Sequence, residues 1–362
     1  MDTLGGAEFA PAQTYLNTAT CGLLPRRTVE AVKLLAEENA AGGPDGAGSF
    51  EAVAAARAGY ARIAGVDPDR VAIGATVSAH VAIVAASLPV GAEVLYPGGD
   101  FSSLITPFAV RGDLKTRSAP LEELADAVRP GTGLVAFSCV QSADGRSADL
   151  PAIREAAAAH GARTLLDATQ SAGWLPLDAG ACDYTVAGGY KFLLCPRGTS
   201  FLTVTEEAQE SLVPVHGGWF AGDDRYGSCY GPVERFAASA RRFDEAPAFL
   251  AYHGAERSLA LLREIGIEAV HPHVTGLAAR FRDGVRALGY EPVPGVSATV
   301  AVPGLGHRQP ELARAGVLVS DRAGNLRVSF HLYNSAADVD RALDVLSGLS
   351  AAPAAAAAPA GG

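Results

Sequence analysis

Short apolar runs recur along the first two thirds of the chain, and each has the length of one β-strand. Stretches whose apolar residues recur at helical spacing separate several of them, as in residues 121–128 and 150–160. Strand–helix–strand repetition predicts a mainly parallel sheet with helices on both faces, so the expected fold class is α/β. The seven predicted strands are residues 70–74, 93–97, 114–118, 133–138, 163–168, 184–188 and 199–204.

Helical patterns lie on both sides of this alternating region, and they suggest how the chain is divided. The clearest amphipathic stretches are residues 26–43, 49–65, 247–266 and 274–289. From about residue 241 the helices become longer and strands fewer, which indicates a second domain. The predicted parts are an N-terminal arm over 1–20, a large domain over 21–240, a smaller α+β domain over 241–349 and a disordered Ala/Pro tail over 350–362.

Composition removes several classes of function. The chain has 362 residues, a formal net charge of −10 and a pI near 5.3, which argues against a nucleic-acid partner. Its five cysteines contain no CxxC pair, so a zinc knuckle or disulfide framework is not expected, no metal site is predicted, and the cytoplasm is the expected location. No signal peptide and no membrane-spanning run are visible. The chain also lacks GxxxxGK(S/T), HExxH, GxSxG and a GxGxxG after a strand, so nucleotide hydrolysis, zinc proteolysis, serine hydrolysis and nicotinamide chemistry lose their usual signatures.

Lysine usage is the first positive signal. The chain has 26 arginines but only three lysines, and Lys191 follows a predicted strand in a glycine-flanked turn. An amine at that edge of the sheet can form a Schiff base if burial or nearby positive charge lowers its pKa. Local sequence alone also permits an ordinary surface lysine.

A carboxylate is expected at the same edge. Asp167 ends a predicted strand whose core needs no charge, and it lies 24 residues before Lys191. An aspartate beside a pyridine nitrogen keeps that nitrogen protonated, which is the arrangement pyridoxal 5'-phosphate (PLP) requires. Taken alone, Asp167 could equally be a helix cap or a turn residue, but the pair points to PLP.

Four segments resemble the class V aminotransferase family of PLP-dependent enzymes, which includes cysteine desulfurases, kynureninases and isopenicillin N epimerase-like proteins. They are YLNTATCGLLPRRTVEAV (15–32), LLDATQSAGWLPLD (165–178), CDYTVAGGYKFLLCPRGTSFL (182–202) and GNLRVSFHLYNSAADVDRALDVL (324–346). The resemblance implies a fold type I PLP enzyme with a seven-stranded, mainly parallel sheet. It also implies a homodimer and a small-molecule amino-acid substrate.

The resemblance assigns roles to individual positions. Lys191 would form the Schiff base and move the α proton, and Asp167 would pair with the pyridinium nitrogen. Other cofactor contacts would come from Ala75 and Thr76 at the phosphate, Tyr190 beside it, Gln170 at the phenolic oxygen and Phe101 stacked on the ring. Substrate contacts would come from Arg327 at the α-carboxylate, Ser142 where many relatives have Asn, and Asn17 at the mouth. Gly188 departs from the Ser or Cys of relatives, and Arg241 and Arg242 have no assigned role.

The reaction type is less determined by sequence. We predict transamination first, because it needs no group beyond the residues just assigned. The alternatives within the family are β-elimination by a carbon–sulfur lyase and epimerisation. A non-catalytic PLP-fold binding protein is an alternative of another class. A desulfurase would carry a nucleophilic cysteine in the loop before Arg327, but residues 316–329 contain none, and the last cysteine is Cys229.

Overall fold

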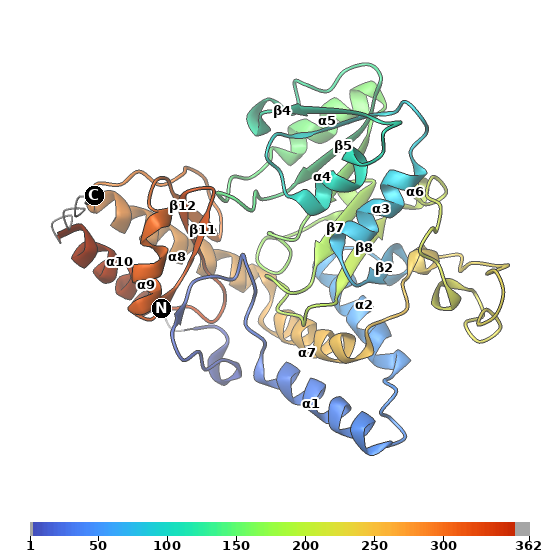
Figure 1. The fold of residues 1–362 in the computed structure, drawn as a ribbon, viewed down its shortest axis with the longest axis horizontal. Helices are drawn as coiled ribbons and strands as arrows, with labels where there is room; N and C mark the ends of the chain where they lie inside the picture. Colours follow the sequence, from blue (N-terminus) through green and yellow to red (C-terminus); the bar gives the residue numbers. More distant parts are fainter. Residues whose placement is uncertain (1–2, 352–362) are drawn as a thin grey trace, which may run out of the picture.

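A computed structural model describes residues 3–351; of the predicted disordered tail, residues 352–362 lie outside the described part (Figure 1). The large sheet has seven strands in the order β2-β8-β7-β6-β5-β3-β4. These are β2 (Val71–Gly74), β3 (Glu93–Pro97), β4 (Lys115–Ala119), β5 (Thr132–Ser138), β6 (Arg163–Asp167), β7 (Tyr184–Gly188) and β8 (Ser200–Val204). β8 runs antiparallel to both its neighbours, and the other pairs are parallel, so the predicted mainly parallel α/β sheet is confirmed.

Both faces of this sheet are buried except at the edge strand β4, which is why the other strands read as nearly continuous apolar runs. In β5, Leu134 and Ala136 pack into a core beneath α3 (Val77–Ser87) and α4 (Ser102–Ala109). The alternate residues Val135 and Phe137 pack into the core on the opposite face. That core is covered by α2 (Phe50–Ala64) and α5 (Leu150–His160), and α5 carries the expected caps, with Asp149 accepting from the Ala152 N–H and Gly161 left-handed at its end.

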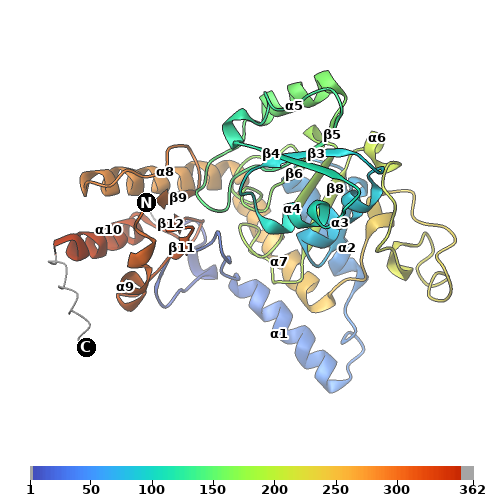
Figure 2. The same ribbon diagram turned by 45° about the horizontal axis from the view of Figure 1, so that its top comes forward.

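A smaller three-stranded sheet, in the order β11-β12-β9, lies to one side of the large one (Figures 1 and 2). Its strands are β9 (Thr299–Val302), β11 (Ser320–Arg322) and β12 (Asn325–Ser329), and α8 (Ile267–Ala287) packs on β9 and on α10 (Ala336–Ala351). The N-terminal segment joins this part of the molecule, because β1 (Thr14–Tyr15) pairs with β10 (Val317–Leu318).

The remaining helices connect these layers. α7 (Phe249–Ile265) packs on α1 (Arg26–Ala41) and on α2. The predicted domain boundary at residue 241 precedes α7, and the division of the chain into domains stays a prediction. The short helices are α6 (Glu206–Gln209) and α9 (Gln309–Arg314), and the 3₁₀ turns are Gly6–Glu8, Pro68–Arg70, Leu121–Glu123, Ala179–Ala181, Trp219–Ala221, Ala240–Phe243 and Gly306–Arg308.

One predicted helix is wrong. Residues 121–128 form only the 3₁₀ turn Leu121–Glu123 followed by further turns. Pro120 and Pro130 bracket the segment, and a proline disfavours helical geometry in the residue before it, so too few residues remain for a stable helix. No helix among residues 3–351 combines the length and the apolar character needed to cross a membrane.

Candidate functional site

The site lies at the carboxyl ends of β6 and β7, where ligands of open α/β sheets collect. Asp167 is the last residue of β6, which pairs in parallel with β7, and Lys191 follows β7 by three residues. Both side chains line a cavity of about 240 Å³. Of the residues predicted from sequence, the cavity is lined by Ala75, Thr76, Phe101, Ser142, Asp167, Gln170, Tyr190 and Lys191. Arg327 and Asn17 are not among its lining residues.

Lys191 is buried, with 5% of its surface exposed. Burial lowers the pKa of its amine to about 8; the Asp167 carboxylate opposes this shift, and Arg327, Arg322 and Arg197 add to it. The amine nitrogen lies 4.9 Å from the centroid of the Phe101 ring and 5.8 Å from that of Tyr190. The lowered pKa increases the neutral fraction of the amine near physiological pH, and the neutral form is the one that a nucleophilic lysine uses.

The backbone around Lys191 is fixed by segments distant in sequence. The Gly22 N–H donates to the Tyr190 carbonyl at 2.9 Å, and the Phe192 carbonyl lies 2.7 Å from Nε2 of the buried His331. A Cβ on Gly22 would lie 2.1 Å from the Lys191 carbonyl oxygen, so this approach requires glycine. The N-terminal loop and the segment after β12 thus hold the lysine in place.

We expect Gly22→Ala to lower the free energy of unfolding by about 2 kcal/mol, because the added methyl group must push the Lys191 backbone away. The same displacement should slow covalent uptake of PLP. Gly112→Ala is the matched control: nothing lies within 4 Å of its Cβ position, so the change should stay within about 0.5 kcal/mol. Urea unfolding of the three proteins measures this, and equal stability of both variants would show that the contact is not a constraint.

Asp167 is equally buried, with 4% of its surface exposed. Burial raises the pKa of its carboxyl group, and hydrogen bonding to Thr169 and the nearby Lys191 amine oppose the rise. The Thr169 N–H donates to Oδ1 at 2.8 Å, while the Thr169 hydroxyl accepts from the Gly188 N–H at 3.0 Å and so joins this turn to β7. No described residue hydrogen-bonds to Oδ2, which leaves that oxygen available to a ligand.

Gln170 also has an atom without a partner. Its amide nitrogen donates to the Ala19 carbonyl at 3.1 Å and to the Ser142 hydroxyl at 3.0 Å. Its Oε1 is buried, and no described residue hydrogen-bonds to it. An unsatisfied buried polar atom is costly, so it marks a place where a bound polar group would gain free energy.

Two functional neighbours of this site were missed by sequence reasoning. Asp100 accepts hydrogen bonds from the Phe101 N–H at 2.6 Å, from the Ser138 N–H at 2.9 Å and from the Gln141 amide at 3.0 Å, and so fixes the residue that faces Lys191. Its signal was an acidic residue three positions after a buried strand, at the same edge of the sheet as Asp167, which ends its strand. Arg197 lines the cavity with its guanidinium 4.2 Å from the Tyr190 ring centroid.

The turn before α3 is the predicted phosphate site. Thr76 caps the helix by accepting from the Ala79 N–H at 3.3 Å. The Ala75 N–H, however, already donates to Glu245 Oε2 at 2.8 Å. A phosphate at this turn would therefore displace the Glu245 carboxylate from Ala75 or bind the other groups around it.

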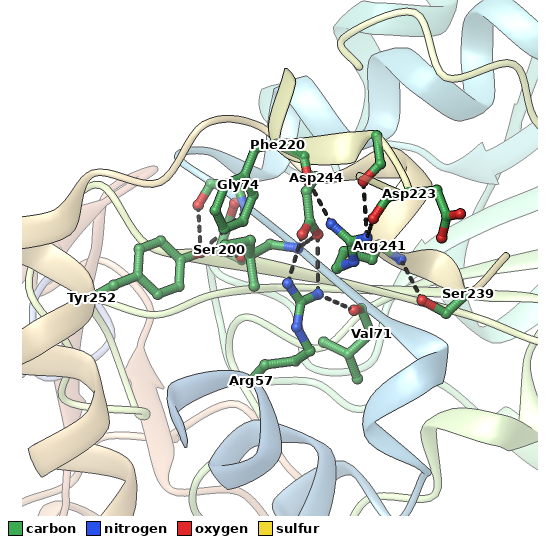
Figure 3. A network of polar contacts seen from close by, with 12 residues as sticks. Arg57, Val71, Gly74, Ser200, Phe220, Asp223, Ser239, Arg241, Asp244 and Tyr252 are labelled. Atoms are coloured by element: carbon green, nitrogen blue, oxygen red, sulfur yellow. Dashed lines mark hydrogen bonds and ion pairs between the residues drawn. The ribbon is translucent and has the colours of Figure 1, made fainter. Parts of the chain in front are cut away.

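Glu245 is positioned by its neighbour Asp244, which forms a buried ion pair with Arg57 of α2 (Figure 3). Asp244 Oδ1 also accepts from the Ile73 N–H at 2.9 Å, one strand position before the turn. Arg241, three residues before Asp244, donates to the carbonyls of Phe220, Gly222 and Asp223 and so ties the two segments together (Figure 3). Arg242 pairs with the exposed Glu210, and neither arginine lines the cavity.

Arg327 is 1% exposed and lies just behind the cavity wall. Its guanidinium donates to the carbonyl and to the hydroxyl of Ser142. It also donates to Thr20 Oγ1 at 2.8 Å and to Ser320 Oγ at 3.1 Å. None of the described carboxylates pairs with it, and burial together with Arg322 lowers its pKa to about 9. Asn17 is half-buried, and its Oδ1 has no partner in the described part of the chain.

Comparison with known proteins identifies the family to which the chain belongs. The sequence profile of the aminotransferase class-V family matches residues 106–302. The uncharacterized aminotransferase YcbU of Bacillus subtilis is 28% identical over 81% of this chain and 82% of its own length. Isopenicillin N epimerase of Amycolatopsis lactamdurans is 29% identical over 94% of this chain and 96% of its own.

The fold is shared with solved structures. A cystine C–S lyase, C-DES, solved with its product cysteine persulfide, superposes with a TM-score of 0.83 at 23% identity, covering 93% of this chain and 97% of the lyase. The chain belongs to the class V aminotransferase family and is an enzyme whose cofactor is PLP.

Proposed function

We propose that this enzyme is an aminotransferase that acts on an α-amino acid with a free carboxylate. The cavity fits PLP because it holds a buried amine, a buried carboxylate with one free oxygen and an unpaired amide oxygen within one space. When bound, PLP supplies an electron sink for bonds at the carbon that bears the amino group.

Lys191 would hold the cofactor through a Schiff base and then carry the α proton. Its position three residues after β7 and its pKa near 8 support both tasks, because a base works best when its pKa lies near the operating pH. Asp167 would receive the pyridinium N–H on its free oxygen. Arg327 would bind the substrate α-carboxylate, since a buried guanidinium without an acidic partner gains most from an anion that forms two parallel hydrogen bonds.

The observation that carries transamination is the pairing of Lys191 with Phe101. The Phe101 ring, whose centroid lies 4.9 Å from the amine, has no proton to give, whereas Tyr190, at 5.8 Å, is the candidate acid–base group that epimerisation would need. Epimerisation requires a second acid–base group, and β-elimination gains from a donor that protonates the leaving group. A single mobile base is enough for transamination. Cys229 is exposed and does not line the cavity, which also disfavours a desulfurase.

The test is a panel of L-amino acids offered to the PLP-loaded enzyme, with and without 2-keto acids. The expected result is transfer of the amino group to the keto acid. Release of sulfide or ammonia without a keto acid would instead establish elimination, and racemisation of the amino acid would establish inversion at the α carbon. Either result would overturn the proposed reaction.

We also expect the capture of PLP by the cofactor-free protein to depend on pH through Lys191. Only the neutral amine attacks an aldehyde, so below a pKa of about 8 the rate should rise about tenfold for each pH unit, and it should level off above that pH. The visible absorption of the Schiff base measures the rate. A rate that kept rising to pH 10 would mean that the amine that captures PLP is not the buried Lys191.

A homodimer is also proposed. An apolar groove between α3 and α4 includes Val110, which is 73% exposed, and it shares Ser78 and Ser103 with the cavity. A second copy seated there would cover apolar surface and the neighbouring site together. The cytoplasmic location stays a prediction.

A further inference from the structure

We propose that the substrate carries a second anionic group, on its side chain, and that Arg322 binds it. This inference rests on the proposed function, in which Arg327 takes the α-carboxylate. It narrows the substrate class to α-amino acids with an acidic side chain.

The two arginines are held together by the β11–β12 hairpin. Ser320 pairs with Arg327 across the hairpin, and Arg322 lies two residues after Ser320, so both arginines are on the same face. Their guanidinium groups converge on one oxygen: Thr20 Oγ1 accepts from Arg327 Nη2 at 2.8 Å and from Arg322 Nη2 at 3.2 Å. Thr20 comes from the N-terminal loop that also packs Gly22 against Lys191.

No carboxylate balances this pair in the described part of the chain. Asp321 points to the other face of the hairpin, where its Oδ1 accepts from the Gly324 N–H at 3.1 Å, and Arg322 donates only to the Asp321 carbonyl and to Thr20. Three arginines, Arg197, Arg322 and Arg327, lower the pKa of Lys191, and only one carboxylate, that of Asp167, raises it. Each of these three arginines lacks a described ion-pair partner.

Two like charges that share one hydroxyl repel each other, and an anion between them relieves the repulsion. The α-carboxylate of one substrate can form a planar bidentate pair with only one guanidinium, which the proposed function assigns to Arg327. Arg322 is exposed and donates to the same Thr20 hydroxyl as Arg327, so an anionic group on the substrate side chain could reach it while Arg327 holds the α-carboxylate. A second carboxylate, or another anion of similar size, completes the charge balance.

The test measures substrate affinity through the change that an amino acid produces in the visible absorption of the PLP-loaded enzyme. L-aspartate and L-glutamate are compared with their amides L-asparagine and L-glutamine. The acids should bind the unmodified enzyme about tenfold more tightly than the amides, a value between those of exposed and buried ion pairs. In Arg322→Gln this ratio should fall to about one, and Arg322→Lys should restore part of it. Arg314→Gln, which removes an exposed arginine bonded only to the Pro310 carbonyl, should keep the full ratio.

The outcomes separate the two proposals. If acids and amides bind equally, or if Arg322→Gln keeps the preference, this inference is overturned, while the absorption change still supports an amino-acid site. If no amino acid changes the absorption of the loaded enzyme, the proposed function fails, and this inference fails with it. Thermal unfolding of each variant shows whether it is folded, and the ratio of two affinities in one protein is independent of the fraction that is active.

Discussion

Replacing Lys191 with alanine is expected to reduce turnover by about 10⁴-fold or more, because it would remove both the amine proposed to form the Schiff base and the base proposed to move the α proton. No described residue that lines the cavity offers a second amine, so none can substitute. Borohydride treatment of the unmodified loaded enzyme should add the mass of the reduced cofactor to the peptide that contains Lys191. The variant should bind PLP without gaining that mass.

Two further variants make this result specific. Lys191→Arg keeps the positive charge, but a guanidinium stays protonated and cannot form the bond, so it should be as inactive as the alanine variant. Lys115→Ala removes an exposed lysine from β4 and should leave both turnover and borohydride labelling unchanged. If Lys191→Ala retained turnover, the assignment of this site would be wrong.

The positions of Asp167 and Lys191 could be predicted because both depend on local pattern. Apolar runs identify strands, parallel strands deliver their carboxyl ends to one edge, and a polar residue at such an end has no role in the core. All seven strands of the large sheet were predicted on this basis. The family resemblance supplied the other cavity residues, which local pattern alone could not rank above surface residues.

The environment of those residues could not be predicted, because contacts across the sequence create it. Arg327 reaches Ser142 across 185 positions and Thr20 across 307. Glu245 reaches the Ala75 N–H across 170 positions, and no motif signals that the predicted phosphate turn already has a carboxylate on it. Hydrophobic periodicity fixes the elements, while the polar partners of a site depend on how distant loops meet.

The Arg57–Asp244 pair is such a contact, and its loss should give the largest effect on stability. Arg57 is 8% exposed and Asp244 is fully buried, with two hydrogen bonds of 2.6 and 3.0 Å between them (Figure 3). Burial alone would lower the pKa of Arg57, but the adjacent carboxylate outweighs burial and raises it. Asp244→Ala leaves the buried Arg57 charge without a counter-ion and the Ile73 N–H without an acceptor. We expect the free energy of unfolding to fall by about 3–5 kcal/mol.

Urea unfolding measures this loss, and Glu210→Ala is the control, because its exposed pair with Arg242 should contribute at most about 1 kcal/mol. The double variant Arg57→Met, Asp244→Leu removes both charges and should recover most of the loss, which separates a stranded charge from a general packing defect. Because Asp244 Oδ1 accepts from the Ile73 N–H two residues before Ala75, Asp244→Ala should also displace the predicted phosphate turn and so weaken PLP binding, whereas Glu210→Ala should not. If Asp244→Ala lost no more stability than Glu210→Ala, the Arg57 guanidinium would have to be hydrated in the variant. The predicted phosphate turn would then not depend on this ion pair.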